Sequence, residues 1–458
     1  MWGLFSKDPT KDFPYESVEE LGQVHLANKT VWRLHRGKHR SSQDAVSIFS
    51  CDSKDGASAT QLEVARAAVK RLKTLRHPSV LTFLHSVETE KAVLLATEPV
   101  SPLAEHLELL VDRGPRRDNY LAWGIFQVCR ALAFLNNDAK LKHNNLHAAS
   151  VFVTPAGDWK LAGLEAVCGT DSDPPLQILP ACQKYSPPER SDPGKARVAS
   201  SWAADVWGLG CLIWEVYNAA LPAMESLAKL GDIPKSLQPI YKECVGANPS
   251  KRPNPTDIIT RLKKSPGYFK NDLIDILLFL EELQIKEDSD KSRFYSSLTG
   301  LLENCPQIVC QNKILPQLVN AFEYGNAGSA ILTPVFKIGK DLDTAEYQAK
   351  IVPCIVKLFS SNDRNARFKL LSQVENFVEH LSGKIVNDQV FPKIESGFLD
   401  SEPLIREKTV ISMIHLAPKL SYSNLDETVV MKHFTRLARD EQGGIRTNTA
   451  VCLGKIAR

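Results

Sequence analysis

The hydrophobic pattern divides the chain into two parts. In the first part, apolar runs of strand length at 45–49 and 92–97 alternate with segments whose apolar residues recur at helical spacing. The first such segment ends at Arg76-His77-Pro78, because proline disfavours a helical conformation in the residue before it. From Leu273 onward the spacing is helical throughout. The helices expected in the first part cover residues 61–75, 121–137 and 203–217.

The second part repeats itself. The six-residue segments that begin at Lys313, Lys350 and Gln389 are similar, and a weaker fourth copy begins near Val429. Their prolines are 37 and 39 residues apart, a spacing typical of HEAT or armadillo repeats, in which helix pairs stack into a solenoid. These prolines are Pro316, Pro353 and Pro392. Within one repeat, four apolar residues are separated by four, three and four positions, which predicts one apolar face of a helix. That face consists of Leu370, Val374, Phe377 and Leu381.

Three arginines recur in the same part. Arg367, Arg406 and Arg446 are 39 and 40 residues apart, and Asp400 and Asp440 each precede such an arginine by six residues. An Asp/Arg pair beside the turn between two helices is a HEAT-like pattern, so we expect these side chains to stabilise turns and stacking. Because terminal repeats normally carry a polar cap and the last helix is rich in apolar residues, we expect the array to continue beyond Arg458.

Composition narrows the class of protein. The chain has 458 residues, of which 43% are hydrophobic and 24% are charged, and its formal charge is only +3. These values are ordinary for a globular protein of two domains and give no global argument for nucleic-acid binding. The sequence has no apolar stretch long enough to span a membrane, and its N-terminus lacks the pattern of a signal peptide. Position 2 is tryptophan, which excludes N-myristoylation.

The 10 cysteines are scattered and form no C-x-x-C pair. We interpret them as reduced, mostly buried thiols, and we expect no metal site, because zinc ligands cluster at short spacings.

Five fragments of the first part resemble the protein kinase fold and occur in the kinase order. The strongest is the helix from Asp205 to Glu215, which is similar to D-x-W-S-x-G-x-x-x-x-E. Pro187-Pro188-Glu189 resembles the A-P-E end of an activation segment, and Arg252 matches the arginine that pairs with that glutamate. His143 lies where the H-R-D loop begins, and the short strands near Val151 and Trp159 follow it. We expect His143, Glu189, Asp205 and Arg252 to maintain the fold.

The residues that would perform phosphoryl transfer are missing. That reaction needs positioned phosphates, a metal held by carboxylate and amide oxygens, and a group that accepts the substrate proton. Only two glycines occur over 17–38, where G-x-G-x-x-G is expected. The strand motif V-A-I-K becomes Val46-Ser-Ile-Phe49, so Phe49 replaces the phosphate-pairing lysine. Ala68 stands where its glutamate partner belongs, and no orphaned charge is left.

The catalytic loop is changed in the same way. Asn145 replaces the aspartate base, His147 the lysine and Ser150 the metal-binding asparagine. Losing the general base typically reduces the rate by about 10²–10⁴-fold. Gly163 replaces the principal magnesium ligand of D-F-G, and Glu165 lies two positions away. We therefore expect a pseudokinase with no cofactor, no metal and no catalytic residue. Thr97 and Glu98 occupy gatekeeper and hinge positions, so an adenine slot could survive, partly filled by Phe49.

A degraded kinase domain followed by HEAT repeats is similar to the Scy-like pseudokinase family. The resemblance includes His143-Asn-Asn, Trp159-Lys-Leu-Ala-Gly-Leu and the segment 322–328, and it extends over essentially the whole chain. It implies a cytoplasmic scaffold at Golgi and ER-Golgi intermediate membranes that supports retrograde traffic to the endoplasmic reticulum. It further implies COPI coat subunits and Arf-class GTPases as partners. The family's coat-binding signal is a C-terminal basic motif that this sequence lacks, which leaves direct coat binding open.

The expected architecture is an α+β protein-kinase-like domain of two lobes followed by an all-α HEAT-repeat solenoid. The expected parts are an N-terminal extension over 1–14, the kinase-like domain over 15–267, connecting helices over 268–310, and HEAT-type repeats over 311–458. Two other functions stay open. One is an atypical active kinase, and the other is a tRNA-binding nuclear export cofactor. A tRNA-binding protein would use two runs of basic residues, although basic residues of this kind are also common on a solvated surface. The first run is Arg36, Lys38, His39 and Arg40, and the second is Lys70, Arg71, Lys73 and Arg76. The sequence also leaves a homo-oligomer open.

Overall fold

The computed structural model describes residues 13–110, 112–173, 175, 177–324, 328–359 and 364–457. The chain forms two compact units, Met1–Asp275 and Ile276–Arg458. Residues 1–12 of the expected N-terminal extension lie outside the described residues, as do Pro174, Arg458 and the side chains of 322–329.

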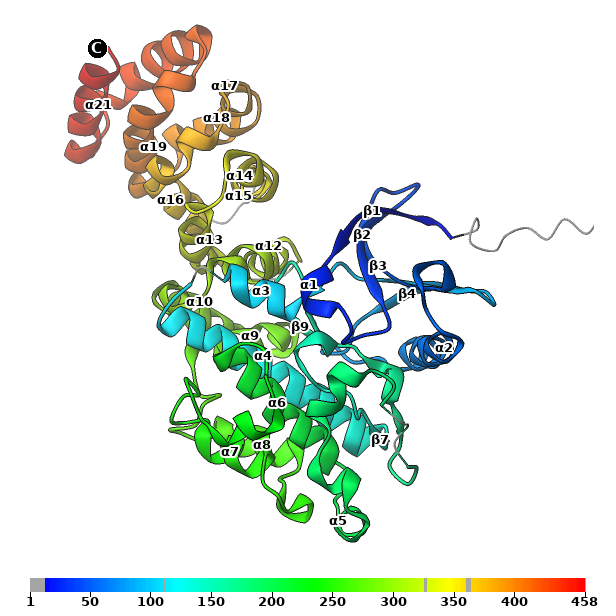
Figure 1. Cartoon of the computed structure of the whole chain (residues 1–458). Helices are drawn as coiled ribbons and strands as arrows, with labels where there is room; N and C mark the ends of the chain where they lie inside the picture. Colours follow the sequence, from blue (N-terminus) through cyan, green and yellow to red (C-terminus); the bar gives the residue numbers. More distant parts are fainter. Residues whose placement is uncertain are drawn as a thin grey trace, which may run out of the picture. The chain divides into compact units, whose positions relative to one another are not determined.

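The first unit begins with an antiparallel sheet in the order β1-β2-β3-β5-β4 (Figure 1). The expected strands at 45–49 and 92–97 are present as β3 and β5, and β3 is three residues longer. The five strands are β1 (Tyr15–Leu21), β2 (Arg33–His39), β3 (Ala45–Asp52), β4 (Phe83–Glu88) and β5 (Ala92–Thr97). One face of the sheet buries Val46, Ile48 and Ala96 together with Phe13, which comes just before the expected domain start.

Helix α2 (Ala59–Thr74) packs beside this sheet (Figure 1). It begins two residues before the expected start because Ser58 forms a capping box. The Ser58 hydroxyl accepts a hydrogen bond from the Gln61 backbone N–H at 3.2 Å, and the Gln61 side chain accepts one from the Ser58 N–H at 2.8 Å. The helix ends at Thr74, one residue before the expected end and ahead of Pro78.

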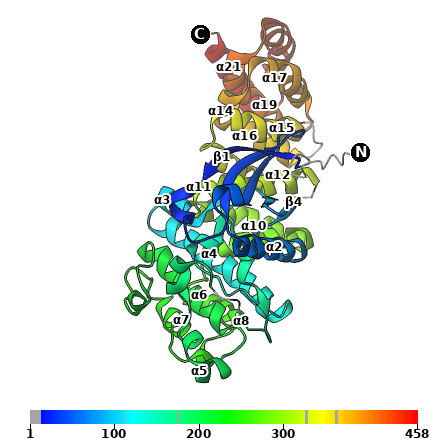
Figure 2. The ribbon, with the colours of Figure 1, turned by 45° about the vertical axis from the view of Figure 1, so that its right-hand side comes forward.

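The helical lobe of the first unit is built on α4 and α6 (Figure 2). Helix α4 (Pro115–Ala133) begins six residues before the expected start, because Gly114 and Pro115 supply a tight turn and a favoured first residue. Helix α6 (Ala203–Asn218) is buried on nearly all sides, as expected of a helix with an apolar sequence all round. The other helices are α1 (Gln23–Leu26), α3 (Leu103–Leu109), α5 (Pro193–Arg197), α7 (Gln238–Cys244) and α8 (Pro255–Lys263). The short strands are β6 (Ser101–Pro102), β7 (Leu141–Lys142), β8 (Val151–Val153), β9 (Trp159–Leu161) and β10 (Cys168–Gly169).

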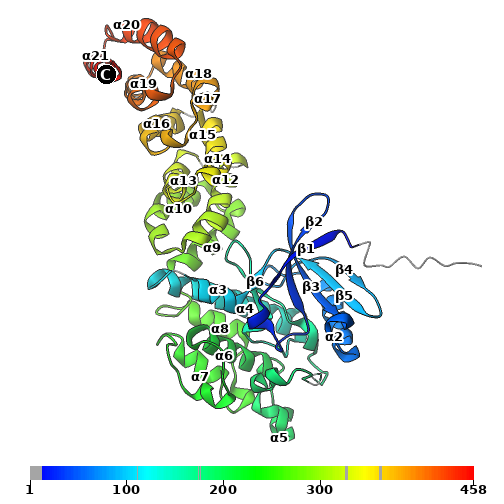
Figure 3. The same ribbon diagram turned by 45° about the horizontal axis from the view of Figure 1, so that its top comes forward.

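The second unit is helical, as predicted, and no strand occurs among its described residues. One row of helices runs through α10, α13, α16, α19 and α21 (Figure 3). The bounds of this row are α10 (Asp288–Leu301), α13 (Leu332–Gly339), α16 (Arg364–Ser372), α19 (Pro403–Leu416) and α21 (Gly443–Ile456). The remaining helices are α9 (Asp272–Glu281), which crosses the unit boundary, α11 (Gln307–Val309), α12 (Leu315–Tyr324), α14 (Thr344–Lys350), α15 (Val352–Phe359), α17 (Gly383–Ile385), α18 (Phe391–Glu395) and α20 (Thr435–Leu437).

The three repeat prolines occupy equivalent places. Pro316, Pro353 and Pro392 are each the second residue of a helix, where the missing N–H is tolerated. Wider π-type turns at Cys310–Ile314 and Val386–Val390 precede two of these helices.

The expected continuous helix through Leu370 and Leu381 is wrong. Helix α16 ends at Ser372, and the backbone leaves helical geometry at Gln373 (φ −122°) and Phe377 (φ −134°). The four expected core residues are nevertheless buried. Tertiary packing explains the break, because the Phe377 ring stacks on Phe336 with centroids 5.2 Å apart.

Candidate functional site

Asp205 supports the loop that begins at His143. Its carboxylate accepts hydrogen bonds from the backbone N–H groups of His143 at 2.8 Å and Asn144 at 2.7 Å, and from Asn136 Nδ2 at 2.7 Å. His143 Nε2 lies 2.7 Å from the carbonyl oxygen of Ala162, and both Asp205 and His143 are buried. These contacts give the loop a fixed shape without involving any substrate.

Glu189 and Arg252, which the sequence pattern pairs, form a bidentate ion pair. Arg252 Nη1 and Nη2 lie 2.6 and 2.9 Å from the two carboxylate oxygens. Arg252 also donates to the Gly246 carbonyl and covers the ring of Trp207. Because hydrogen bonds satisfy both buried charges, the pair can hold the end of the activation segment in place.

Phe49 fills the cleft where a kinase holds the triphosphate. Its ring packs edge-on against Phe152 from β8 and Trp32 before β2, with centroids 5.2 and 6.3 Å away. Ala68 of α2 lines the same space and adds no charge. An aromatic cluster thus replaces the cation that the position would need for phosphate binding.

Little space remains in this cleft. The cavity lined by Phe49, Ala68, Phe152 and Gly163 has a volume of about 30 Å³. Small-molecule sites in proteins typically measure about 300–1,000 Å³. The cavity is therefore too small for a nucleotide in this conformation.

Ser47 of β3, which sequence reasoning missed, bonds through its side chain to Val100 at the hinge between the lobes. Its hydroxyl accepts a hydrogen bond from the Val100 backbone N–H at 2.9 Å and donates to the Val100 carbonyl at 3.1 Å. Adenine presents a donor and an acceptor on one edge, so it would need such a pair of backbone groups. The available signal was the serine in Val46-Ser-Ile-Phe49, where V-A-I-K has alanine.

The expected gatekeeper and hinge residues are also engaged within the chain. Thr97 is fully buried, and its hydroxyl donates to the Glu98 carbonyl at 3.0 Å. Glu98 accepts from the Thr82 N–H at 2.8 Å and pairs with Lys160 at 3.3 Å.

The altered catalytic loop forms an internal network. Asn145 Nδ2 donates to the Gly163 carbonyl at 3.2 Å and to Glu165 Oε2 at 3.3 Å, while Asn145 Oδ1 lies 3.3 Å from His147 Nε2. The His147 ring stacks on Tyr185 with centroids 4.6 Å apart, and burial lowers the pKa of His147 to about 3. Its imidazole is therefore neutral near pH 7.

Ser150 and Gly163 complete the loop. The Ser150 hydroxyl donates to the His147 carbonyl at 2.8 Å and accepts from the His147 N–H at 3.1 Å. Gly163 has a left-handed backbone (φ 69°), and a Cβ there would lie 2.6 Å from Ser150 Cβ. A side chain at 163 would therefore require Ser150 to move.

Glu165 joins the two lobes through a residue that sequence reasoning also missed. Trp32 Nε1 donates to Glu165 Oε1 at 2.5 Å, across 133 residues of sequence. Burial raises the pKa of the Glu165 carboxyl, and the hydrogen bonds from Trp32 and Asn145 act in the opposite direction. Its carboxylate is thus already engaged by Trp32 and Asn145.

The segment expected to hold the glycine-rich cover folds differently. Residues Gln23–Leu26 form the short helix α1, introduced by Gly22 at a φ of 67°. A Cβ at Gly22 would lie 2.5 Å from Pro102 Cγ, so the close approach requires glycine. This helix and the loop after it bring Trp32 into the cleft.

In the second unit, Arg367 and Arg406 reach the aspartate of the next repeat, whereas Arg446 contacts the turn of its own repeat. Arg406 Nε and Nη2 donate to the Asp440 carboxylate at 2.9 and 3.1 Å, and Arg406 Nη1 donates to the Asp400 carbonyl at 2.8 Å. Arg367 lies 4.0 Å from the Asp400 carboxylate, and Arg446 donates to the Asp440 carbonyl at 2.8 Å. Arg406 and Arg446 thus each donate to the backbone of the turn at the preceding aspartate, while Arg367 approaches the aspartate of the next repeat.

All ten cysteines lie within the described residues and none of them is in a disulfide; nine are buried, and Cys168 is partly exposed. Within the described residues, no three His, Cys, Asp or Glu side chains are grouped so that they could hold a metal ion. Among the described helices, none combines the length and apolar character needed to cross a bilayer.

Comparisons with known proteins agree with these features. The protein kinase domain family matches residues 30–265. A Dictyostelium discoideum protein named probable inactive serine/threonine-protein kinase scy1 is 36% identical over 98% of this chain and 54% of its own length. The mouse protein-associating with the carboxyl-terminal domain of ezrin is 28% identical over 77% of this chain and 48% of its own length. The chain thus spans about half the length of these relatives.

Among solved structures, the crystal structure of Cex1p matches the fold with a TM-score of 0.67 and 20% identity. The match covers 99% of this chain and 82% of that one.

Proposed function

The chain belongs to the protein kinase family, among its Scy1-like pseudokinases, and from this premise we propose that it is a catalytically inactive scaffold. The scaffold supports COPI-dependent retrograde traffic from the Golgi to the endoplasmic reticulum and Golgi organisation, through protein–protein binding. Its partners are COPI coat subunits and Arf-class GTPases, which the Scy-like resemblance implies. It acts in the cytoplasm and associates peripherally with Golgi and ER-Golgi intermediate membranes.

The filled cleft carries this proposal. Phe49, Phe152 and Trp32 leave about 30 Å³ in a site that would have to hold a nucleotide. The fold-holding contacts of Asp205 and of the Glu189–Arg252 pair are complete in the same unit. A kinase body with intact support and a closed cleft fits a role in binding other proteins.

The helical array supports the same function. Stacked helix pairs bury a continuous core and expose extended surfaces that suit protein binding. One relative is named for associating with a domain of another protein, which is consistent with a binding role for this chain.

A binding experiment tests the scaffold proposal. We expect the purified chain, immobilised on beads, to retain purified COPI coat or GTP-loaded Arf-class GTPase. The matched comparison is a shortened protein that lacks residues Ile276–Arg458, the second unit. Loss of binding with the helical unit would assign the surface to the array. Retention of neither coat nor GTPase would refute the trafficking role, while the absence of phosphoryl transfer would stand as a separate result.

The tRNA-binding alternative is tested separately. Several cations of its two basic runs pair with carboxylates: Arg36 with Glu19 at 3.1 Å, Lys38 with Glu16 at 3.0 Å, and Lys73 with Glu88 at 3.2 Å. These pairs reduce the positive charge available to phosphates. A carrier of tRNA would show an affinity that falls steeply with salt, because phosphate contacts release counterions. We expect weak binding with no such dependence.

A further inference from the structure

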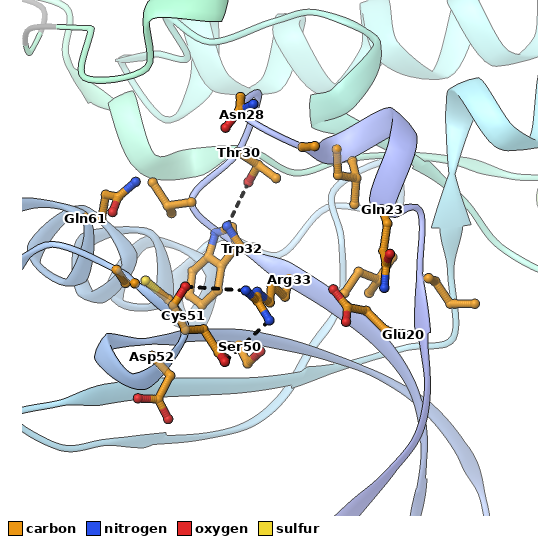
Figure 4. Close-up of a pocket in the computed structure, with 18 residues that line it drawn as sticks. Glu20, Gln23, Asn28, Thr30, Trp32, Arg33, Ser50, Cys51, Asp52 and Gln61 are labelled. Atoms are coloured by element: carbon orange, nitrogen blue, oxygen red, sulfur yellow. Dashed lines mark hydrogen bonds and ion pairs between the residues drawn. The ribbon is translucent and has the colours of Figure 1, made fainter.

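An open pocket lies in the first unit, beside the filled cleft (Figure 4). Its volume is about 510 Å³, within the range of about 300–1,000 Å³ that is typical of ligand sites. Helix α1, the loop after it and the start of β2 line one side. The end of β3, the turn at Ser53–Asp55 and the first residues of α2 line the other side.

The lining of this pocket carries an excess of negative charge. Glu20, Asp52 and Asp55 contribute three carboxylates, whereas Arg33 contributes one guanidinium. Arg33 Nη1 lies 3.4 Å from Asp55 Oδ1, so this pair largely neutralises itself. Asp52 Oδ1 accepts a backbone hydrogen bond from Lys54 at 2.8 Å. Glu20 is partly buried and lies opposite His35 in the β1–β2 pair.

The same pocket has an apolar wall. Leu26 and Leu34 line it and are almost fully buried. Trp32 also lines it, and Figure 4 places this side chain in the middle of the pocket residues. Indole is the best aromatic partner for a cation within about 6 Å of its ring. The pocket therefore combines carboxylates, an apolar surface and a tryptophan.

We propose that this pocket binds an organic cation, a guanidinium or ammonium group on an apolar stem. The carboxylates would attract the charged end, and the apolar wall would cover the stem. Either a free small amine or an arginine or lysine side chain of a partner protein carries this chemistry. The inference is independent of the COPI and Arf partners proposed above, because it rests only on the pocket.

Trp32 gives the pocket a connection to the filled cleft. The indole lines both spaces, and its Nε1 donates to Glu165 in the activation segment. A ligand that packs on Trp32 would hold the indole in the position that closes the cleft. Binding is therefore expected to raise the melting temperature of the first unit.

Isothermal titration of the purified chain tests the proposal with four probes. Agmatine represents a free amine and acetyl-Ala-Arg-Ala-amide represents a side chain of a partner; the matched glutamine and glutamate peptides serve as uncharged and anionic controls. We expect one or both cationic probes to bind and the two controls not to bind. Stronger binding of the peptide would assign the site to a partner protein, and stronger binding of agmatine would assign it to a small amine.

Conservative variants identify the residues. Glu20→Gln and Asp52→Asn should each weaken cation binding by about two- to fivefold, the effect of a half-exposed ion pair. Glu63→Gln, a matched charge change on the exposed face of α2, should leave it unchanged. Thermal melts of each variant establish that it folds. Three results would overturn the proposal. One is equal cation binding by all three variants, and another is binding of the anionic peptide that depends on Arg33. The third is that neither cationic probe binds.

Discussion

The Ser47 hydroxyl and the Val100 backbone satisfy each other's hydrogen bonds at the hinge between the lobes. Ser47 Oγ accepts from the Val100 N–H at 2.9 Å and donates to its carbonyl at 3.1 Å. One side chain thus uses both a donor and an acceptor that an adenine base would otherwise need. The cleft is closed at the hinge as well as by the aromatic cluster around Phe49.

Removal of this hydroxyl should destabilise the protein. Ser47→Ala leaves the buried N–H and C=O groups of Val100 without partners, and each such group costs about 1–3 kcal/mol. We expect the free energy of unfolding in urea to fall by at least about 2 kcal/mol. Ser50→Ala, on the same strand but half-buried and bonded to His35, should have a smaller effect. Equal effects of the two variants would contradict the role assigned to Ser47.

The Phe49 ring should contribute strongly to stability. Phe49→Ala removes a buried ring from contact with Phe152 and Trp32, and such a truncation typically costs about 3–5 kcal/mol. Phe49→Leu keeps most of the volume and should lose clearly less. Urea unfolding of both variants measures the difference. A stable Phe49→Ala protein would mean that the ring is not a core residue.

ATP with magnesium should not stabilise the protein. A ligand that binds the native state raises stability in proportion to the logarithm of its concentration, so the melting temperature would rise with ATP if the cleft accepted it. We expect a flat response in differential scanning fluorimetry and no phosphate transfer from labelled ATP. The double variant Ser47→Ala/Phe49→Leu, in which both obstacles are reduced with a smaller loss of stability, is where nucleotide binding should first appear. A concentration-dependent shift of the unaltered chain would refute the closed cleft.

Acid should destabilise the first unit through His147. Burial lowers the pKa of this imidazole to about 3, whereas the unfolded chain has an ordinary value near 6.5. Between these values the unfolded state binds a proton that the folded state excludes, so the stability contributed by His147 is lost as pH falls. The expected slope is about 1.4 kcal/mol per pH unit.

His147→Gln should therefore reduce the decrease in unfolding free energy between pH 6 and pH 4. His39→Gln, a matched change at the partly exposed end of β2, serves as the control. Urea unfolding at several pH values measures all three proteins. The same slope in all of them would show that His147 does not titrate as described.

The link between repeats should depend on Arg406 more than on Arg446. Arg406 forms two hydrogen bonds to the Asp440 carboxylate in a half-buried setting, where hydrogen bonds to charged groups contribute about 1.5–3 kcal/mol. Arg446 is exposed and donates only to carbonyl oxygens of Asp440 and Glu441. We expect Arg406→Ala to lower the stability of the second unit by about 1–3 kcal/mol, and Arg446→Ala by less than about 1 kcal/mol. Hydrogen exchange in α19 and α21 reports both effects, and a larger loss in Arg446→Ala would reverse the assignment.

The sequence by itself determined the class of the two parts and the chemistry that the first had lost. Helical periodicity and strand-length apolar runs are local properties, so β3, β5, α2 and α6 follow from them. The replacement of a lysine by Phe49 and of an aspartate by Asn145 changes the chemistry whatever the exact geometry. Neither conclusion needed distances between residues that are remote in sequence.

Only the tertiary structure showed which side chains fill the cleft where a kinase would bind its nucleotide. Ser47 meets Val100 across 53 residues, and Trp32 meets Glu165 across 133. The break after Ser372 has the same origin, since the Phe377 ring packs on Phe336 in preference to continuing a regular helix. Local patterns specify elements, whereas buried donors and acceptors and rings find their partners only when the chain is folded.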